Sequence, residues 1–268
     1  MYIPIKDRKY WLEIEGEGIP VLLFHGFTGT TNTWSEIVPY LNESHKVIRM
    51  DLPGHGKTVT NGVISMLQFC DDLAIILEKL KLEKTHLLGY SLGGRTALSF
   101  ACVYPEKVLS LVIESGTAGL KEEQDRKLRQ EADLASAKEI LDDGIPAFIN
   151  KWERLPLFET QAQLPNDIQK KIKEERLSQT STGLSLSLTG MGTGFMPNWW
   201  THLEKLPIPT LILVGDLDLK FVKIGKEMHK LFPNSEFQII SDSGHAIHVE
   251  QPKIFGTIVS EFISKQEI

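Results

Sequence analysis

The heptapeptide Gly89-Tyr90-Ser91-Leu92-Gly93-Gly94-Arg95 constrains the fold of this chain more than any other stretch. It follows the short apolar run Thr85–Leu88 and opens into a segment of helical character, Thr96–Ala101. A G-x-S-x-G pentapeptide between a strand and a helix predicts a sharp turn that lifts the serine side chain off the edge of a sheet. The glycines at 89 and 93 let the backbone pass close on both sides of Ser91.

Short apolar runs recur along the chain, each followed by glycine or proline. Their nearly continuous apolarity is typical of strands that are buried on both faces of a mostly parallel sheet. Between them lie helical patterns such as residues 66–80, and this alternation predicts an α/β fold. The expected strands include Val21–Phe24, Val47–Met50, Leu87–Leu88, Leu109–Ile113, Thr210–Val214 and Glu236–Ile240.

The alternation stops between residues 119 and 203. This stretch is polar and helical in pattern, prolines at 146, 156 and 165 divide it, and no strand-like run appears in it. The strands on either side need each other to complete one sheet. We therefore predict a single α/β domain over residues 1–268, with a helical cap inserted at about residues 119–203.

Composition excludes several classes of protein. A net charge of −6 without any basic run argues against nucleic-acid binding. No apolar stretch approaches the ~20 residues of a membrane span, and the N-terminus lacks a signal pattern. Cys70 and Cys102 are expected to be unrelated reduced thiols. These observations predict a cytoplasmic protein.

A serine hydroxyl gains reactivity when an imidazole accepts its proton and a carboxylate orients that imidazole. On this type of turn the acid and then the histidine follow the serine along the chain. Asp216 and Asp218 both follow a late strand. We favour Asp218, because Gly215 can turn the chain and leave the third residue beyond it pointing at Ser91.

The predicted base is His245, which leaves the last strand in Ser243-Gly244-His245. His248 is the competitor, but it lies about one helical turn further on and would face away. His25 directly follows an early strand, so we expect a structural role for it. The turn from Asp51 to Gly56 is expected to shape the rim of the pocket.

An oxyanion hole needs two backbone N–H groups. Leu92, the residue after the serine, supplies one, and Phe27 in the glycine-containing loop 24–29 is expected to supply the other. The glycine-rich run 190–194 lacks the lysine and the preceding strand of a phosphate loop. No cluster of Cys, His and Asp has metal-ligand spacing, so we expect neither a metal nor another cofactor.

The serine turn, His25-Gly26-Phe27 and residues 51–56 together resemble the α/β-hydrolase superfamily, and the resemblance covers essentially the whole chain. It implies a mostly parallel central sheet flanked by helices, with an inserted helical cap. It says little about the substrate, because this scaffold carries many chemistries.

A narrower resemblance rests on residues 89–95 together with Gly119-Leu120, residues 155–158 and residues 187–194. This set resembles the 2-succinyl-6-hydroxy-2,4-cyclohexadiene-1-carboxylate synthase family, which eliminates pyruvate in menaquinone biosynthesis. The resemblance implies a lyase. Its small-molecule substrate is a cyclohexene that bears a succinyl group, a ring carboxylate and an enolpyruvyl ether, and hence three carboxylates.

The three carboxylates imply that Arg95 binds the substrate, because bidentate guanidinium–carboxylate pairs bind and orient such a ligand. The family uses further arginines from the cap, and the resemblance maps them to Arg129 and Arg176. Arg126, on the same charged helix as Arg129, is the alternative. The resemblance also implies that the pocket is lined by Tyr90, Trp152 and Phe158, with ordinary cap packing as the alternative for these aromatic residues and above all for Phe158.

The expected mechanism is an elimination in which Ser91, deprotonated by His245, removes a ring proton. No covalent serine intermediate is required, and the part played by the Phe27 and Leu92 amides stays open. Two alternatives compete with this reading. One is a carboxylesterase or thioesterase-like hydrolase that acts on a carboxylate-bearing substrate. The other is an inactive binding protein of the same fold, which the complete set of catalytic residue types disfavours.

Overall fold

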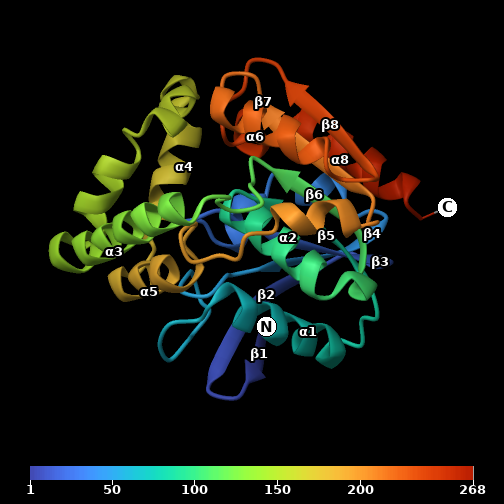
Figure 1. The fold of residues 1–268 in the computed structure, drawn as a ribbon, viewed down its shortest axis with the longest axis horizontal. Helices are drawn as coiled ribbons and strands as arrows, with labels where there is room; N and C mark the ends of the chain where they lie inside the picture. The colour runs from blue at the N-terminus through green and yellow to red at the C-terminus, as the bar shows by residue number, and fades with distance from the viewer. Residues whose placement is uncertain (268) are drawn as a thin grey trace.

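The structure is a computed structural model that describes residues 1–267; Ile268, the last residue of the predicted domain, lies outside the described residues. An eight-stranded sheet in the order β1-β2-β4-β3-β5-β6-β7-β8 forms its centre. β1 and β2 pair antiparallel at one edge, and β3 to β8 run parallel (Figure 1). The strands are β1 (Tyr2–Ile5), β2 (Arg8–Glu15), β3 (Ile19–Phe24), β4 (His45–Met50), β5 (Thr85–Tyr90), β6 (Val108–Glu114), β7 (Thr210–Gly215) and β8 (Ser235–Ile240).

The predicted fold class is confirmed. Every residue of β5 and β7 is buried, which explains why the central strands read as continuous apolar runs. The antiparallel strands β1 and β2 were not expected. β2 carries charged residues and has only two buried positions, so its sequence lacks the apolar run by which the central strands are recognised.

Helices cover both faces of the sheet. On one face pack α1 (Met66–Lys79), α2 (Leu92–Val103) and α6 (Leu219–His229). The other face is covered by α8 (Pro252–Lys265) and by the short helices η1 (Thr31–Trp34) and η2 (Val38–Tyr40). The remaining short helices outside the segment between β6 and β7 are η3 (Pro105–Lys107) and α7 (Ile247–Glu250).

The segment between β6 and β7 is entirely helices and connecting loops in the described chain, and we call residues 119–203 the helical insertion. The segment between β6 and β7 contains α3 (Glu123–Trp152), η4 (Pro156–Gln163), α4 (Asn166–Leu177), α5 (Ser181–Met191) and η5 (Trp200–Lys205), the last of which extends two residues beyond the helical insertion. Figure 1 shows α3, α4 and α5 grouped at the left of the sheet. α3 and α5 share a small apolar core that includes Ile140, Phe148 and Leu184.

Gly144 interrupts α3. Its backbone lies at φ 80° and ψ 169°, outside the helical region, and Pro146 follows two residues later. Because proline cannot donate the helical hydrogen bond, the two residues together turn the second half of α3. No helix within residues 1–267 is both long enough and apolar enough to cross a membrane.

Candidate active site

The predicted strand, turn and helix are present around Ser91. Ser91 joins β5 to α2 with a backbone φ of 52° and ψ of −105°, a strained conformation for a residue with a side chain. The turn depends on the two glycines. A Cβ atom on Gly93 would lie 1.9 Å from the Phe24 carbonyl oxygen, and one on Gly89 would lie 2.2 Å from the Gly93 carbonyl oxygen.

Three side chains from distant parts of the chain form a hydrogen-bonded row at the carboxyl ends of the strands. His245 Nε2 lies 3.0 Å from Ser91 Oγ, and His245 Nδ1 lies 2.7 Å from Asp218 Oδ2. Asp218 caps α6, where its Oδ1 accepts a hydrogen bond of 3.2 Å from the Phe221 N–H. These distances are those of a nucleophile or base, its proton acceptor and an orienting acid.

The competing residues lie elsewhere. Asp216 Oδ1 accepts a 3.3 Å hydrogen bond from the Ser243 N–H, so this carboxylate supports the loop that carries His245. His248 is buried against Glu114, with 2.8 Å between its Nδ1 and Glu114 Oε2. The geometry therefore agrees with the choice of Asp218 and His245.

His25 is part of the framework. Its Nε2 accepts a 3.0 Å hydrogen bond from the Leu52 N–H, and its Nδ1 lies 2.7 Å from the Gly26 carbonyl oxygen. Accepting at Nε2 places the proton on Nδ1, so the imidazole is neutral. Complete burial lowers the pKa of His25 to about 4, against a small opposing effect of the Gly26 carbonyl.

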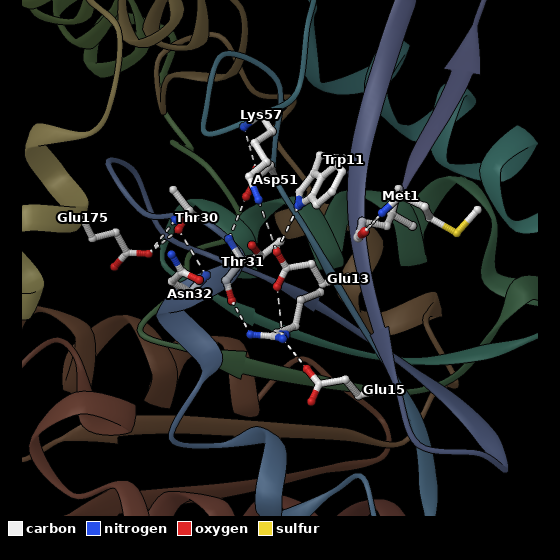
Figure 2. A network of polar contacts seen from close by, with 12 residues as sticks. Met1, Trp11, Glu13, Glu15, Thr30, Thr31, Asn32, Asp51, Lys57 and Glu175 are labelled. Atoms are coloured by element: carbon white, nitrogen blue, oxygen red, sulfur yellow. Dashed lines mark hydrogen bonds and ion pairs between the residues drawn. The ribbon is translucent and has the colours of Figure 1, made fainter.

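The Asp51 turn holds the loop that carries Phe27. Asp51 Oδ1 accepts a hydrogen bond of 2.7 Å from the Thr31 N–H, and its Oδ2 accepts one of 2.7 Å from the Lys57 N–H (Figure 2). From the opposite side Glu175 of α4 accepts a 2.9 Å hydrogen bond from the Thr30 N–H. The loop is thus fixed both by the sheet and by the helical insertion.

The two predicted oxyanion donors flank one cavity. Phe27 and Leu92 both line it, and neither backbone N–H has a hydrogen-bond acceptor among residues 1–267. Leu92 is the first residue of α2, where backbone N–H groups have no partner within the helix. Both groups are therefore available to a bound oxygen.

This first cavity has a volume of about 200 Å³ and lies between the sheet and the helical insertion. Ser91 and His245 contribute to its wall, and Tyr90, Trp152 and Phe158 supply aromatic surface to it. The Tyr90 ring centroid lies 5.3 Å from that of His245. All three aromatic residues named from the sequence thus meet at this cavity.

Two arginines line the same cavity. Arg95 is buried and its Nη1 donates a 2.8 Å hydrogen bond to the Met191 carbonyl oxygen. Burial and the neighbouring Arg129 lower the pKa of Arg95 to about 10, and Asp133 opposes this change. Arg129 Nε lies 2.7 Å from Asp133 Oδ1. Arg126 does not line the cavity, so the geometry favours Arg129.

Arg176 lies in a second, larger cavity of about 790 Å³ beside α4. Phe27, Tyr90 and Phe158 line both cavities, so the two adjoin. The Arg176 guanidinium lies 4.7 Å from the centroid of the Phe158 ring and donates a 2.8 Å hydrogen bond to Gln161 Oε1. The structure thus places Arg176 next to the other predicted residues: it lies against the Phe158 ring, whose centroid is 6.3 Å from that of His245.

Other residues at the site were missed from the sequence. Asp133 holds Arg129 and also accepts a 3.0 Å hydrogen bond from the Gly194 N–H. The i, i+4 spacing of Arg129 and Asp133 on one helix predicts such an ion pair from the sequence. Lys220, in the first turn of α6, also lines the first cavity and was not predicted from the sequence. In the described part of the chain no group of three or more His, Cys, Asp or Glu side chains is arranged to hold a metal.

The comparisons with known proteins agree with this geometry. A family model described as the alpha/beta hydrolase fold matches residues 19–252. A protein of Bacillus subtilis (strain 168), named provisionally as a 2-succinyl-6-hydroxy-2,4-cyclohexadiene-1-carboxylate synthase, is 45% identical over 91% of this chain and 90% of its own length. The chain belongs to the 2-succinyl-6-hydroxy-2,4-cyclohexadiene-1-carboxylate synthase family of α/β-hydrolases.

More distant members of the same synthase family also match over nearly their whole length. The synthase of Enterobacter sp. (strain 638) is 27% identical over 92% of this chain and 92% of its own. The solved structure of MenH from S. aureus superposes with a TM-score of 0.92 at 37% identity, and the match covers 98% of this chain and all of that one. The family assignment therefore covers the helical insertion as well as the sheet.

Proposed function

We propose that this protein is a lyase of menaquinone biosynthesis. It would eliminate pyruvate from 2-succinyl-5-enolpyruvyl-6-hydroxy-3-cyclohexene-1-carboxylate to give 2-succinyl-6-hydroxy-2,4-cyclohexadiene-1-carboxylate. The observation that carries the proposal is the cavity wall itself, where Arg95 and Arg129 stand beside a serine that is hydrogen-bonded to a histidine. Two guanidinium groups in the wall of a cavity that also has much aromatic and aliphatic surface suit a ligand with several carboxylates.

The catalytic step follows from the hydrogen-bonded row. His245 Nε2 takes the Ser91 hydroxyl proton, and Asp218 stabilises the imidazolium that forms. The Ser91 oxygen then takes the ring proton next to the succinyl carbonyl. The electrons of that C–H bond form a new ring double bond, the existing ring double bond shifts by one position, and the bond to the enolpyruvyl oxygen breaks. Pyruvate leaves as its enolate and takes up the proton held by the His245 imidazolium. Ser91 keeps the ring proton, so that both side chains return to their starting state.

Backbone donors support the charge that develops during this step. Proton removal places negative charge on the succinyl carbonyl oxygen, and fixed donors stabilise such charge when water is excluded. The Phe27 and Leu92 N–H groups, which have no acceptor in the described chain, are the groups that we assign to this oxygen.

The helical insertion acts in this proposal as a cap that selects the substrate. Arg129 and Trp152 come from α3, Phe158 from η4 and Arg176 from α4. Their positions support a ligand whose reacting carbon meets Ser91 and whose carboxylates meet arginines in both adjoining cavities. The first cavity alone is smaller than the clefts of about 300–1,000 Å³ that hold drug-sized ligands.

The test compares two activities of the purified protein. The enolpyruvyl cyclohexene substrate is generated enzymatically, and pyruvate release is measured beside a panel of activated esters. We expect rapid pyruvate release, slow ester turnover and no accumulation of a Ser91 adduct. Rapid ester turnover without pyruvate would instead establish the serine hydrolase alternative.

A further inference from the structure

Two serine hydroxyls at the wall of the first cavity have no hydrogen-bond partner within residues 1–267. They belong to Ser115, in the turn after β6, and to Ser187, on α5. Ser115 is fully buried and Ser187 is 3% exposed. A buried hydroxyl without a partner lowers the stability of the unliganded protein, because its lost hydration is not replaced. Its presence at a cavity wall indicates a ligand group that supplies the missing partner.

The backbone at Ser115 supplies a second observation. Ser115 has a φ of 48°, in the left-handed region that residues with side chains seldom occupy, and Ser91 has a φ of 52°. The two turns are joined by a 2.9 Å hydrogen bond from the Ser91 N–H to the Glu114 carbonyl oxygen. Strained residues of this kind gather at functional sites, where the surrounding fold holds them in place.

The chemistry of the wall indicates which part of a ligand the two serines recognise. Arg95 and Arg129 are suited to bind carboxylates. The uncharged oxygen atoms of the ligand then need uncharged hydrogen-bonding partners, such as serine hydroxyls. A hydroxyl group can donate to one oxygen and accept from another, as a serine hydroxyl does. We infer that Ser115 and Ser187 together bind the ring hydroxyl of the ligand. This inference rests on the proposed function, because the ring hydroxyl belongs to that substrate and its product.

The two serines stand on different parts of the fold. Ser115 follows a strand of the sheet, whereas Ser187 belongs to the helical insertion. A ligand hydroxyl bonded to both ties the insertion to the sheet when the site is occupied. A site built to hydrogen-bond a hydroxyl discriminates strongly against an analogue without one, since its polar groups are then left unpaired.

The experiment measures binding by calorimetry for the wild type, Ser115→Ala, Ser187→Ala and the double variant. One probe is the product, 2-succinyl-6-hydroxy-2,4-cyclohexadiene-1-carboxylate. The other is 2-succinylbenzoate, which keeps the two carboxylates and the ketone but lacks the ring hydroxyl. We expect each single change to weaken product binding about fivefold to tenfold. Binding of 2-succinylbenzoate should change less than twofold.

A matched control comes from the same helix. Ser185 is buried on α5 but does not line the first cavity, so Ser185→Ala makes the same chemical change outside the site. Thermal unfolding without ligand is the second measurement. Ser187→Ala should unfold at least as high in temperature as Ser185→Ala, because it removes an unpartnered hydroxyl. A hydroxyl with a structural role would lower the unfolding temperature instead.

The outcomes separate this inference from the proposed function. Variants that bind the product as tightly as the wild type overturn the inference, and so does a wild type that does not bind the product. An equal loss for both probes also overturns it, because the ring hydroxyl is then not the group recognised. Pyruvate release by the wild type is measured independently, and its absence counts against the proposed function alone.

Discussion

Arg95 is the residue whose environment says most about the substrate. It is buried at the first cavity with one hydrogen bond to a backbone carbonyl, and no acid is paired with it among the described residues. Burying an unpaired cation is costly unless a ligand supplies the counter-charge. The pattern of a cation one turn after the serine could be read from the sequence, and the structure shows that Arg95 faces the same space as Ser91.

Replacement of Arg95 tests this reading. We expect Arg95→Ala to lower kcat/KM for the tricarboxylate substrate by about 100-fold, since a charge-assisted hydrogen-bonded pair contributes about 2–3 kcal/mol. Turnover of a neutral activated ester should change by less than about threefold. The control is Arg126→Ala, which removes an arginine that does not line the cavity. Equal losses on both substrates would mean that Arg95 supports the serine turn structurally.

Residue types and their order along the chain were sufficient to name Ser91, Asp218 and His245. Each follows a strand, and parallel strands bring their carboxyl ends to one edge of the sheet. The partner of Arg129 could also have been read from the i, i+4 spacing of Asp133. The unpartnered hydroxyls of Ser115 and Ser187 could not be predicted from the sequence. Whether a buried hydroxyl has a hydrogen-bond partner depends on all the residues packed around it, which come from distant parts of the chain.

At the scale of elements, η4 is joined to the loop that carries His245. Glu250 of α7 accepts a 2.7 Å hydrogen bond from the Gly244 N–H and one of 3.0 Å from Thr160 Oγ1. Gly244 leaves room for this contact, because a Cβ atom there would lie 2.4 Å from Thr160 Oγ1. The position of the helical insertion is therefore coupled to the position of His245.

Removal of this link should affect turnover as well as stability. Thr160→Val keeps the shape of the side chain and removes the hydrogen bond to Glu250. We expect a loss of about 1 kcal/mol in the free energy of unfolding and a fall of about fivefold in kcat/KM for pyruvate release. Thr189→Val is the matched change, since the Thr189 hydroxyl bonds within α5. Identical kinetics for both variants would show that the link does not position His245.

Elements differ in how far their sequences reveal them. The central strands and α1 were predicted because an apolar run or a helical period carries each of them. β1 and β2 lie at the sheet edge, where partial exposure allows charged residues and weakens the pattern. The division of the site into two cavities depends on how α4 packs against the loop at residues 28–33, which no local pattern encodes.

For the whole molecule, buried histidines link folding to pH. Burial lowers the pKa of His25 and of His86 to about 4, and the nearby His45 adds to the effect on His86. In the unfolded chain both pKa values return to about 6.5. The unfolded state therefore binds more protons between pH 6.5 and 4, so stability is fully present above pH 6.5 and falls as the pH drops through that window. Glu175 and Glu250, whose pKa values burial raises, oppose this trend.

The contribution of His25 can be isolated with one variant. In His25→Gln the amide oxygen can replace Nε2 as the acceptor for the Leu52 N–H. We expect the wild type to lose about 2 kcal/mol more than this variant between pH 7 and pH 4.5. Urea unfolding at a series of pH values measures both curves. Parallel curves would contradict a neutral, buried His25 as a source of acid sensitivity.

The place of the helical insertion has an evolutionary consequence. It leaves the sheet after β6 and returns at β7, and these two strands are neighbours, so the sheet closes without it. The proposed catalytic residues Ser91, Asp218 and His245 lie outside it, whereas four of the proposed substrate-binding residues lie within it: Arg129, Trp152, Phe158 and Arg176. Part of the proposed substrate recognition is thus encoded in a stretch of the gene that contains none of the proposed catalytic residues, whereas Arg95 and Tyr90 lie beside Ser91. Exchange of one stretch can give the scaffold a new substrate while the inherited serine, histidine and aspartate stay where they are.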